Sequence, residues 1–234
     1  MIDAPVSVVI PIYNRADLLA ETLDCIGNQT FRPRETIVVD DGSTDDLDGV
    51  ARRYPEAIFL HLRHSGAAVA KSEGARRATQ PFLAFLDADD LWPETRTERM
   101  LAPLLARHDV QIVTGCVQQF RISPSGTREV LGQPMASRLP SVSLIRRDAF
   151  WRVGAFSSQW QVGETIEWCV RAVDAGLTID AIPDVVLLRR VHAANLGKTA
   201  KDPGKAYLHM LRSVMERRRG KGTATQSDPK ETGK

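Results

Sequence analysis

The stretch Phe82-Leu-Ala-Phe-Leu-Asp-Ala-Asp-Asp90 joins a run of apolar residues to three carboxylates, those of Asp87, Asp89 and Asp90. The apolar run predicts a buried strand with both faces covered. Carboxylates at the end of such a strand are unfavourable unless a positive partner neutralises them. A divalent metal ion with a phosphorylated ligand is the usual partner, because Mg²⁺ and Mn²⁺ prefer oxygen ligands. For Asp90, capping of the turn that follows is an alternative interpretation.

A second apolar run, Thr36-Ile-Val-Val39, also ends in acids, in the sequence Asp40-Asp41-Gly-Ser43. Apolar runs alternate with helical patterns through the first half of the chain, and they predict strands over 7–10, 36–40, 58–62 and 82–86 and helices over 16–26, 45–54 and 67–78. This βαβαβαβ order predicts an α/β fold, a single domain with a mostly parallel central sheet flanked by helices. Ligands of such sheets bind beyond the carboxyl ends of the strands. We therefore expect both groups of acids at one binding edge, although an Asp-Gly turn alone would also explain Asp40 and Asp41.

The second half of the chain is less regular. Its patterns predict helices over 95–107 and 164–175, strands over 110–120, 179–182 and 185–191, and a loop or hairpin over 121–140. A C-terminal helix is expected over 204–219, followed by a disordered tail over 220–234 that is rich in Gly, Ser, Thr and Lys. The basic run Arg217-Arg-Arg-Gly-Lys221 is typical of a solvated helix end, and weak contact with an anionic membrane surface is the alternative.

The composition excludes several classes of protein. The chain has 234 residues, 43% of them apolar and 26% charged, which is ordinary for a globular domain. A net charge of +2 gives no field that favours nucleic acid. Cys25, Cys116 and Cys169 lie far apart, which predicts free thiols in a reducing cytoplasm rather than disulfides or a zinc site. No apolar run approaches the ~18 residues of a membrane span, and no signal-peptide pattern opens the chain, so we expect a cytoplasmic protein.

Four segments, in this order, resemble the signature of the family 2 glycosyltransferases: Val8-Val-Ile-Pro-Ile-Tyr-Asn-Arg15, Asp40-Asp-Gly-Ser43, Gly66-x-x-x-Ala-Lys-x-x-Gly74 and Leu86-Asp-Ala-Asp-Asp90. A looser likeness continues through Gly163-Glu-Thr-Ile-Glu-Trp168 and Arg189-Arg-Val-His-x-x-Asn195. The resemblance implies the GT-A fold and an inverting transfer of one sugar from a nucleoside diphosphate donor, for which UDP is expected. It also implies that residues 1–110 form the nucleotide-sugar-binding half of the domain and residues 111–203 the acceptor-binding half.

The resemblance further implies roles for particular residues. Pro11 and Tyr13 would border the donor base, and Asp40 and Asp41 would bind the base or the ribose. Lys71 stands near the donor, where the family usually has arginine. Asp87 would face the ribose with Ala88 beside it, and Asp89 would ligate the Mn²⁺ or Mg²⁺ that bridges the diphosphate oxygens. From its own chemistry, His192 is a candidate second ligand, although a lone histidine is more often structural.

An inverting transfer also needs a base that takes the proton of the acceptor hydroxyl. The family uses an aspartate in a Glu-Asp pair, but the matching stretch here is Glu164-Thr165, and threonine cannot be this base. Glu164 and Glu167, which share a helix face, are the candidates. A catalytically silent nucleotide-sugar-binding protein and a sugar nucleotidyltransferase are the alternatives. The acceptor, whether a glycan, a lipid-linked sugar, a peptide or a small metabolite, is not predicted by the sequence.

Overall fold

The computed structural model describes residues 2–160 and 163–192, together with residues 204, 208–210, 212, 213, 215 and 216 of the C-terminal segment. Those last residues are helical, in agreement with part of the helix expected over 204–219. The rest of that helix and the tail over 220–234 lie outside the described residues. No described helix is both long and apolar enough to cross a membrane. The expected cytoplasmic location stays a prediction.

The first half of the chain alternates strands and helices as the sequence predicts. Its elements are β1 (Ile2–Ile12), α1 (Ala16–Gly27), β2 (Phe31–Asp40), α2 (Leu47–Arg53), β3 (Ile58–His61), α3 (Ala67–Arg77) and β4 (Phe82–Phe85). The prediction for α2 was wrong at its start. Asp46 caps this helix by accepting a hydrogen bond from the Gly49 N–H at 3.0 Å, whereas Ser43 accepts one from the Asn14 N–H.

The second half departs further from expectation. It contains α4 (Arg96–Ala106), β5 (Ile112–Ile122), β6 (Arg128–Ala136), a 3₁₀ turn (Pro140–Val142), β7 (Ser143–Arg146), α5 (Arg147–Val153), α6 (Glu164–Asp174) and β8 (Ile179–Arg190). The hairpin between β5 and β6 confirms one of the two expectations for residues 121–140. The sequence analysis missed β7 and α5, because each is too short to show a clear period. It also divided β8 at Pro183, where the pairing with β5 shifts register and one strand continues.

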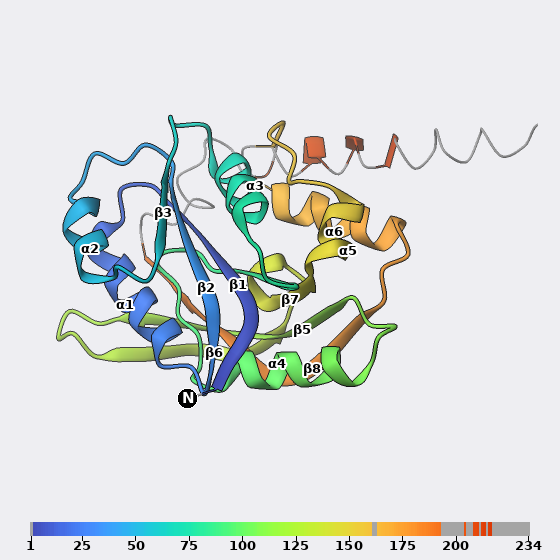
Figure 1. Ribbon diagram of the computed structural model, residues 1–234, viewed down its shortest axis with the longest axis horizontal. Coiled ribbons are helices and arrows are strands. Elements are labelled where there is room, and N and C mark those ends of the chain that lie inside the picture. The colour runs from blue at the N-terminus through green and yellow to red at the C-terminus, as the bar shows by residue number, and fades with distance from the viewer. Residues whose placement is uncertain are drawn as a thin grey trace, which may run out of the picture.

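All eight described strands form one sheet in the order β3-β2-β1-β4-β7-β5-β6, with β8 paired to β5. Strands β1 to β4 are parallel to one another, whereas β7 runs antiparallel to both β4 and β5. Helices cover both faces, and β1 and β2 run upward in Figure 1 from the N-terminal marker. The α/β class with a central sheet flanked by helices is confirmed. The carboxyl ends of β1 to β4 meet at the upper edge.

Helix α3 packs closely on this sheet because Gly74 faces it. A Cβ atom at Gly74 would lie 2.3 Å from a Val9 methyl carbon of β1 and 3.0 Å from one of Val39 in β2. Both valines are fully buried, so neither can move away without disturbing the core. The second glycine of the Gly66-x-x-x-Ala-Lys-x-x-Gly74 motif is therefore a packing residue.

We expect Gly74→Ala to destabilise the fold by about 1–3 kcal/mol, because the added methyl group must displace buried valines. Urea unfolding followed by circular dichroism measures this change. Gly27→Ala in α1 is the matched control, since nothing lies within 4 Å of a Cβ there. Alanine is the better helix former, so the control should unfold at the same or slightly higher urea concentration. Equal stability of the two variants would contradict this packing account.

Candidate functional site

The loop after β4 is held in place from two sides. The Asp90 N–H donates to the Asp87 carbonyl, and the Thr22 hydroxyl of α1 donates to the carbonyl of Ala88 at 2.8 Å and to that of Asp90 at 3.1 Å. Asp90 is buried, its carboxylate accepts the Arg190 N–H at 2.9 Å, and burial raises its pKa well above the usual range. These contacts give Asp90 a structural role, and they leave Asp87 and Asp89 as the acids that face outward.

The same loop is joined to the end of β8. The Arg190 guanidinium donates to the Asp89 carbonyl at 3.0 Å and forms an ion pair with Glu21 of α1. Arg128 of β6 also pairs with Glu21, at 3.1 Å. Arg190 therefore ties the acidic loop to α1 and, through Glu21, to the β5–β6 hairpin.

Asp89 and His192 face each other at this edge. The Asp89 Oδ2 and His192 Nε2 atoms are 2.8 Å apart, and both side chains are partly exposed. Neighbouring ligand atoms on an octahedral ion lie about 3 Å apart, so this pair fits one divalent metal ion. Within the described ranges no group of three or more His, Cys, Asp or Glu residues could hold a metal. The protein would thus supply two ligands, and phosphate oxygens and water the others, as is usual for Mg²⁺.

Lys71 brings together two further residues that the sequence analysis selected. This lysine of α3 is only 7% exposed, and its Nζ atom lies 3.4 Å from the Asp87 carboxylate and 3.3 Å from that of Glu164. Burial would lower the pKa of Lys71, but the two carboxylates more than offset this and raise it above its ordinary value. Lys71 is thus a charged link between the loop after β4 and the first turn of α6.

The two candidate bases have different surroundings. Glu167 is buried and accepts two hydrogen bonds from Arg171 Nε, at 3.1 and 2.9 Å. The other nitrogens of Arg171 donate to the carbonyls of Val153 and Ala155. Glu167 therefore belongs to an ion pair that attaches α6 to the segment after α5. Glu164 lies at the start of α6 and contacts Lys71, which favours it over Glu167 as the residue that faces a substrate.

Asp40 and Asp41 both accept hydrogen bonds from the protein itself. Asp40 accepts the Ser43 N–H at 2.8 Å and lies 3.1 Å from His61 Nδ1. Burial would raise the pKa of Asp40, but the contacts with Ser43 and His61 lower it overall. Asp41 accepts the N–H groups of Ser65 and Gly66, at 2.7 and 2.9 Å. The turn interpretation therefore applies in part to Asp40, whose carboxylate accepts from Ser43, whereas the Asp41 carboxylate holds the loop that leads into α3.

Pro11 and Tyr13 border the same edge. Pro11 lies within β1 opposite Val39, and Tyr13 follows the strand with 46% of its surface exposed. The ring of His64 lies beside that of Tyr13, with 4.3 Å between the ring centroids. The sequence analysis missed His61, His64 and Arg190 as possible site residues. For the two histidines a signal existed, because His61 ends β3, His64 follows it, and that strand ends at the same edge.

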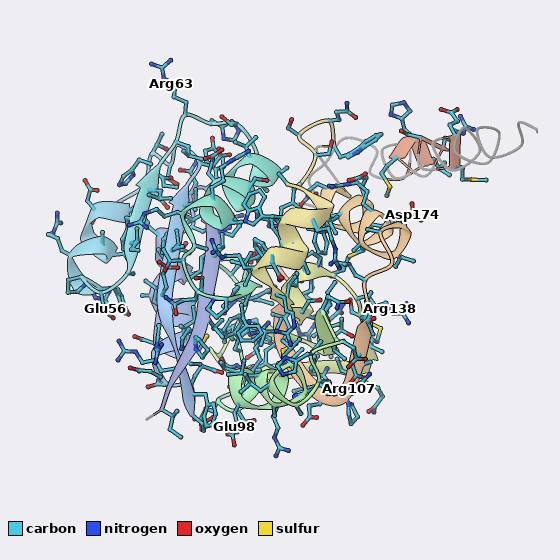
Figure 2. The ribbon with its side chains drawn as sticks, turned by 45° about the vertical axis from the view of Figure 1, so that its right-hand side comes forward. Glu56, Arg63, Glu98, Arg107, Arg138 and Asp174 are labelled. Carbon is cyan, nitrogen blue, oxygen red and sulfur yellow. The ribbon has the colours of Figure 1, made fainter. Side chains whose placement is uncertain are left out.

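The acids thus come from strands that share one edge. Strand β1 lies between β2 and β4 and is parallel to both, so the loops with Asp40 and with Asp89 leave the sheet on the same side. Residues 62–66, which follow β3, reach the top of the molecule, where Arg63 projects outward in Figure 2. The acids, the buried Lys71 and His192 thus lie at the carboxyl edge of the sheet, where α/β proteins bind their ligands.

Comparison with solved structures identifies the fold of this chain. The crystal structure of Staphylococcus aureus TarS 1-349 in complex with UDP-GlcNAc matches with a TM-score of 0.72 and 17% identity, over 89% of this chain and 65% of that one. The fold is therefore that of the GT-A glycosyltransferases. Residues 7–154 match the family model described as glycosyl transferase family 2. The chain belongs to glycosyltransferase family 2.

Curated relatives share part of their length with this chain. The uncharacterized glycosyltransferase YibD of Escherichia coli (strain K12) is 31% identical over 158 residues, which cover 66% of this chain and 45% of that protein. Validoxylamine A glucosyltransferase of Streptomyces hygroscopicus subsp. limoneus is 34% identical over 154 residues, which cover 62% of this chain and 33% of that protein. The chain thus spans less than half the length of these two relatives.

Proposed function

We propose that this chain transfers one sugar from a UDP-sugar to an acceptor nucleophile, with inversion at the anomeric carbon. The observation that carries the proposal is the link from Asp87 through Lys71 to Glu164, beside the pair of Asp89 and His192, at one edge of the sheet. Family membership supports glycosyl transfer. The UDP-GlcNAc complex of TarS, which has the same fold, supports a UDP-sugar as donor.

In this proposal the donor lies across the edge formed by β1, β2 and β4. Pro11 and Tyr13 border the base, Asp40 and Asp87 bind the base and ribose, and Ala88 forms part of the wall. Asp89 and His192 would hold Mn²⁺ or Mg²⁺. When bound, that ion would neutralise charge on the diphosphate as it departs.

Glu164 is the proposed base. As the acceptor oxygen attacks the anomeric carbon, its proton passes to the Glu164 carboxylate, the new glycosidic bond forms, and the bond between that carbon and the diphosphate oxygen breaks. UDP leaves with the bonding electron pair. Lys71 holds the Glu164 carboxylate in place before the acceptor arrives. Glu167 supports the first turn of α6 through Arg171.

One observation favours a second candidate function. Thr165 occupies the position of the family's aspartate, and Glu164 is already paired with Lys71. A chain that binds UDP-sugars without turning them over would have these features. Release of UDP from UDP-glucose or UDP-GlcNAc in the presence of Mn²⁺ distinguishes the two, because the silent protein binds UDP but releases none from either donor. Membership of a glycosyltransferase family removes the support for a sugar nucleotidyltransferase.

The acceptor side is proposed in outline only. Residues 1–110 would bind the donor and residues 111–203 the acceptor, which is a glycan, a lipid-linked sugar, a peptide or a small metabolite. Weak contact of the basic C-terminal helix with a membrane surface stays a prediction, because its basic run lies outside the described residues.

Lys71→Met should raise the Kd for UDP by about tenfold or more, because Asp87 and Glu164 lose the cation that separates them. Since the pKa of Lys71 is raised above 10.5, the pairing is complete below that pH and is lost only above it. The effect of the substitution should therefore be constant between about pH 6 and about pH 9. Isothermal titration calorimetry of UDP at the two ends of this pH range measures the effect. Lys71→Arg is the control and should bind UDP nearly as well as wild type; equal binding by Lys71→Met would contradict the proposed role.

A further inference from the structure

Two aromatic rings lie against each other at the edge where the base of the donor is proposed to bind. Tyr13 follows β1, and His64 belongs to the loop between β3 and α3. Their ring centroids are 4.3 Å apart and the ring planes are inclined by 32°. Both residues remain open to solvent, with Tyr13 46% exposed and the His64 side chain 61% exposed. His64 thus contacts the Tyr13 ring and leaves much of that ring accessible.

The loop that carries His64 is built around the Asp41 carboxylate. Asp41 accepts the Ser65 N–H at 2.7 Å and the Gly66 N–H at 2.9 Å with its carboxylate. His64 Nδ1 is hydrogen-bonded to the Asp41 main-chain carbonyl at 3.0 Å and also lies 3.0 Å from Asp41 Oδ2. Gly66 adopts a φ of +94°, a conformation that favours glycine. Asp41 therefore fixes the backbone of this loop through its buried carboxylate and orients the imidazole ring through its main-chain carbonyl.

A second set of contacts supports the same loop from below. The Leu62 N–H donates to the Asp40 carbonyl at 2.8 Å. Gly42 lies directly against His64, because a Cβ atom on Gly42 would be 3.0 Å from the His64 backbone nitrogen. Gly42 also has a positive φ of +83°. The segment Asp40-Asp41-Gly-Ser43 thus supports the loop over 62–66. This motif therefore has a structural role in addition to its proposed contact with a ligand.

We propose that His64 is a positioning residue for donor recognition: held by Asp41, it supports one face of the Tyr13 ring and leaves the other face as the surface on which the nucleotide base stacks. The inference rests on the proposed function and deepens it. It assigns Asp41 to the support of His64, whereas Asp40 retains the direct contact with the donor. An aromatic ring fixed in advance loses less entropy when a base stacks on it, so the support increases affinity.

Calorimetric titration of UDP and of inorganic pyrophosphate, each with Mn²⁺, tests this role. His64→Ala should raise the Kd for UDP by about tenfold and leave the Kd for pyrophosphate, which has no base, unchanged. His64→Phe keeps a ring against Tyr13 and should stay within about threefold of wild type. His64→Asn keeps a polar partner for Asp41 without a ring and should resemble His64→Ala. Melting temperatures of the variants verify that each one folds.

Two results would overturn the inference alone. One is a His64→Ala protein that binds UDP as tightly as wild type. The other is an equal loss of affinity for UDP and pyrophosphate, which would give His64 only a structural part in the loop. Wild-type protein that binds no UDP with Mn²⁺ would instead overturn the proposed function, and this inference with it.

Discussion

Glu164→Gln is expected to reduce the release of UDP from a UDP-sugar by about 10³-fold and to leave the Kd for UDP nearly unchanged. Glutamine has the shape of glutamate and can still accept a hydrogen bond from Lys71, which lies 3.3 Å from Glu164 Oε1. It cannot take the proton of an acceptor hydroxyl. The measurement is a coupled assay for UDP with Mn²⁺, paired with calorimetric titration of UDP.

Two further variants make this result specific. Glu56→Gln changes an exposed glutamate that lies away from the proposed donor edge in Figure 2, and it should retain wild-type turnover. Thr165→Asp restores the Glu-Asp pair typical of the family, and in the Glu164→Gln background it should recover part of the lost turnover. Full activity of Glu164→Gln alone would show that the base lies elsewhere.

Asp89→Ala is expected to remove the dependence of UDP binding on Mn²⁺ and to reduce turnover by at least about 10³-fold. In this proposal Asp89 supplies an oxygen ligand beside His192, at 2.8 Å, and the described residues contain no group of three or more His, Cys, Asp or Glu that could hold the ion instead. The change in melting temperature that UDP causes should then be the same with and without Mn²⁺. Thermal unfolding in four conditions, with each ligand alone, both and neither, measures this.

Asp48→Ala is the matched control for this loss of a carboxylate. Asp48 is exposed in α2, and its removal should change neither the Mn²⁺ dependence nor the turnover. His192→Ala should reduce the dependence of UDP binding on Mn²⁺ only in part, because Asp89 remains as a charged ligand. If UDP binding by Asp89→Ala depends on Mn²⁺ as fully as in wild type, the metal ligands have been assigned to the wrong residues.

The sequence predicts the carboxyl edge of the sheet and its acids well because its signals are local. Continuous apolar runs mark β1, β2 and β4, and the acids that end two of them follow directly in the chain. Parallel strands then place these acids at one edge without further information. The same reasoning could have included His61, which ends β3, and His64, which follows it.

Other parts of the site depend on contacts between distant segments, which no local pattern reveals. Lys71 and Glu164 are 93 positions apart and meet only because α3 and the start of α6 flank the loop after β4. The difference between Glu164 and Glu167 arises in the same way, since Arg171 pairs with Glu167 and also donates to the carbonyls of Val153 and Ala155. The strand β7 escaped prediction because its four residues are defined by pairing with β4 and β5.

The central claim is that acids from separate strands form one metal-dependent nucleotide site. Calorimetric titration of wild-type protein with UDP, in Mn²⁺ and in EDTA, tests it most directly. We predict binding that is at least about tenfold tighter with Mn²⁺, since the ion would join Asp89 and His192 to the diphosphate. Failure to bind UDP both in Mn²⁺ and in EDTA would contradict the claim.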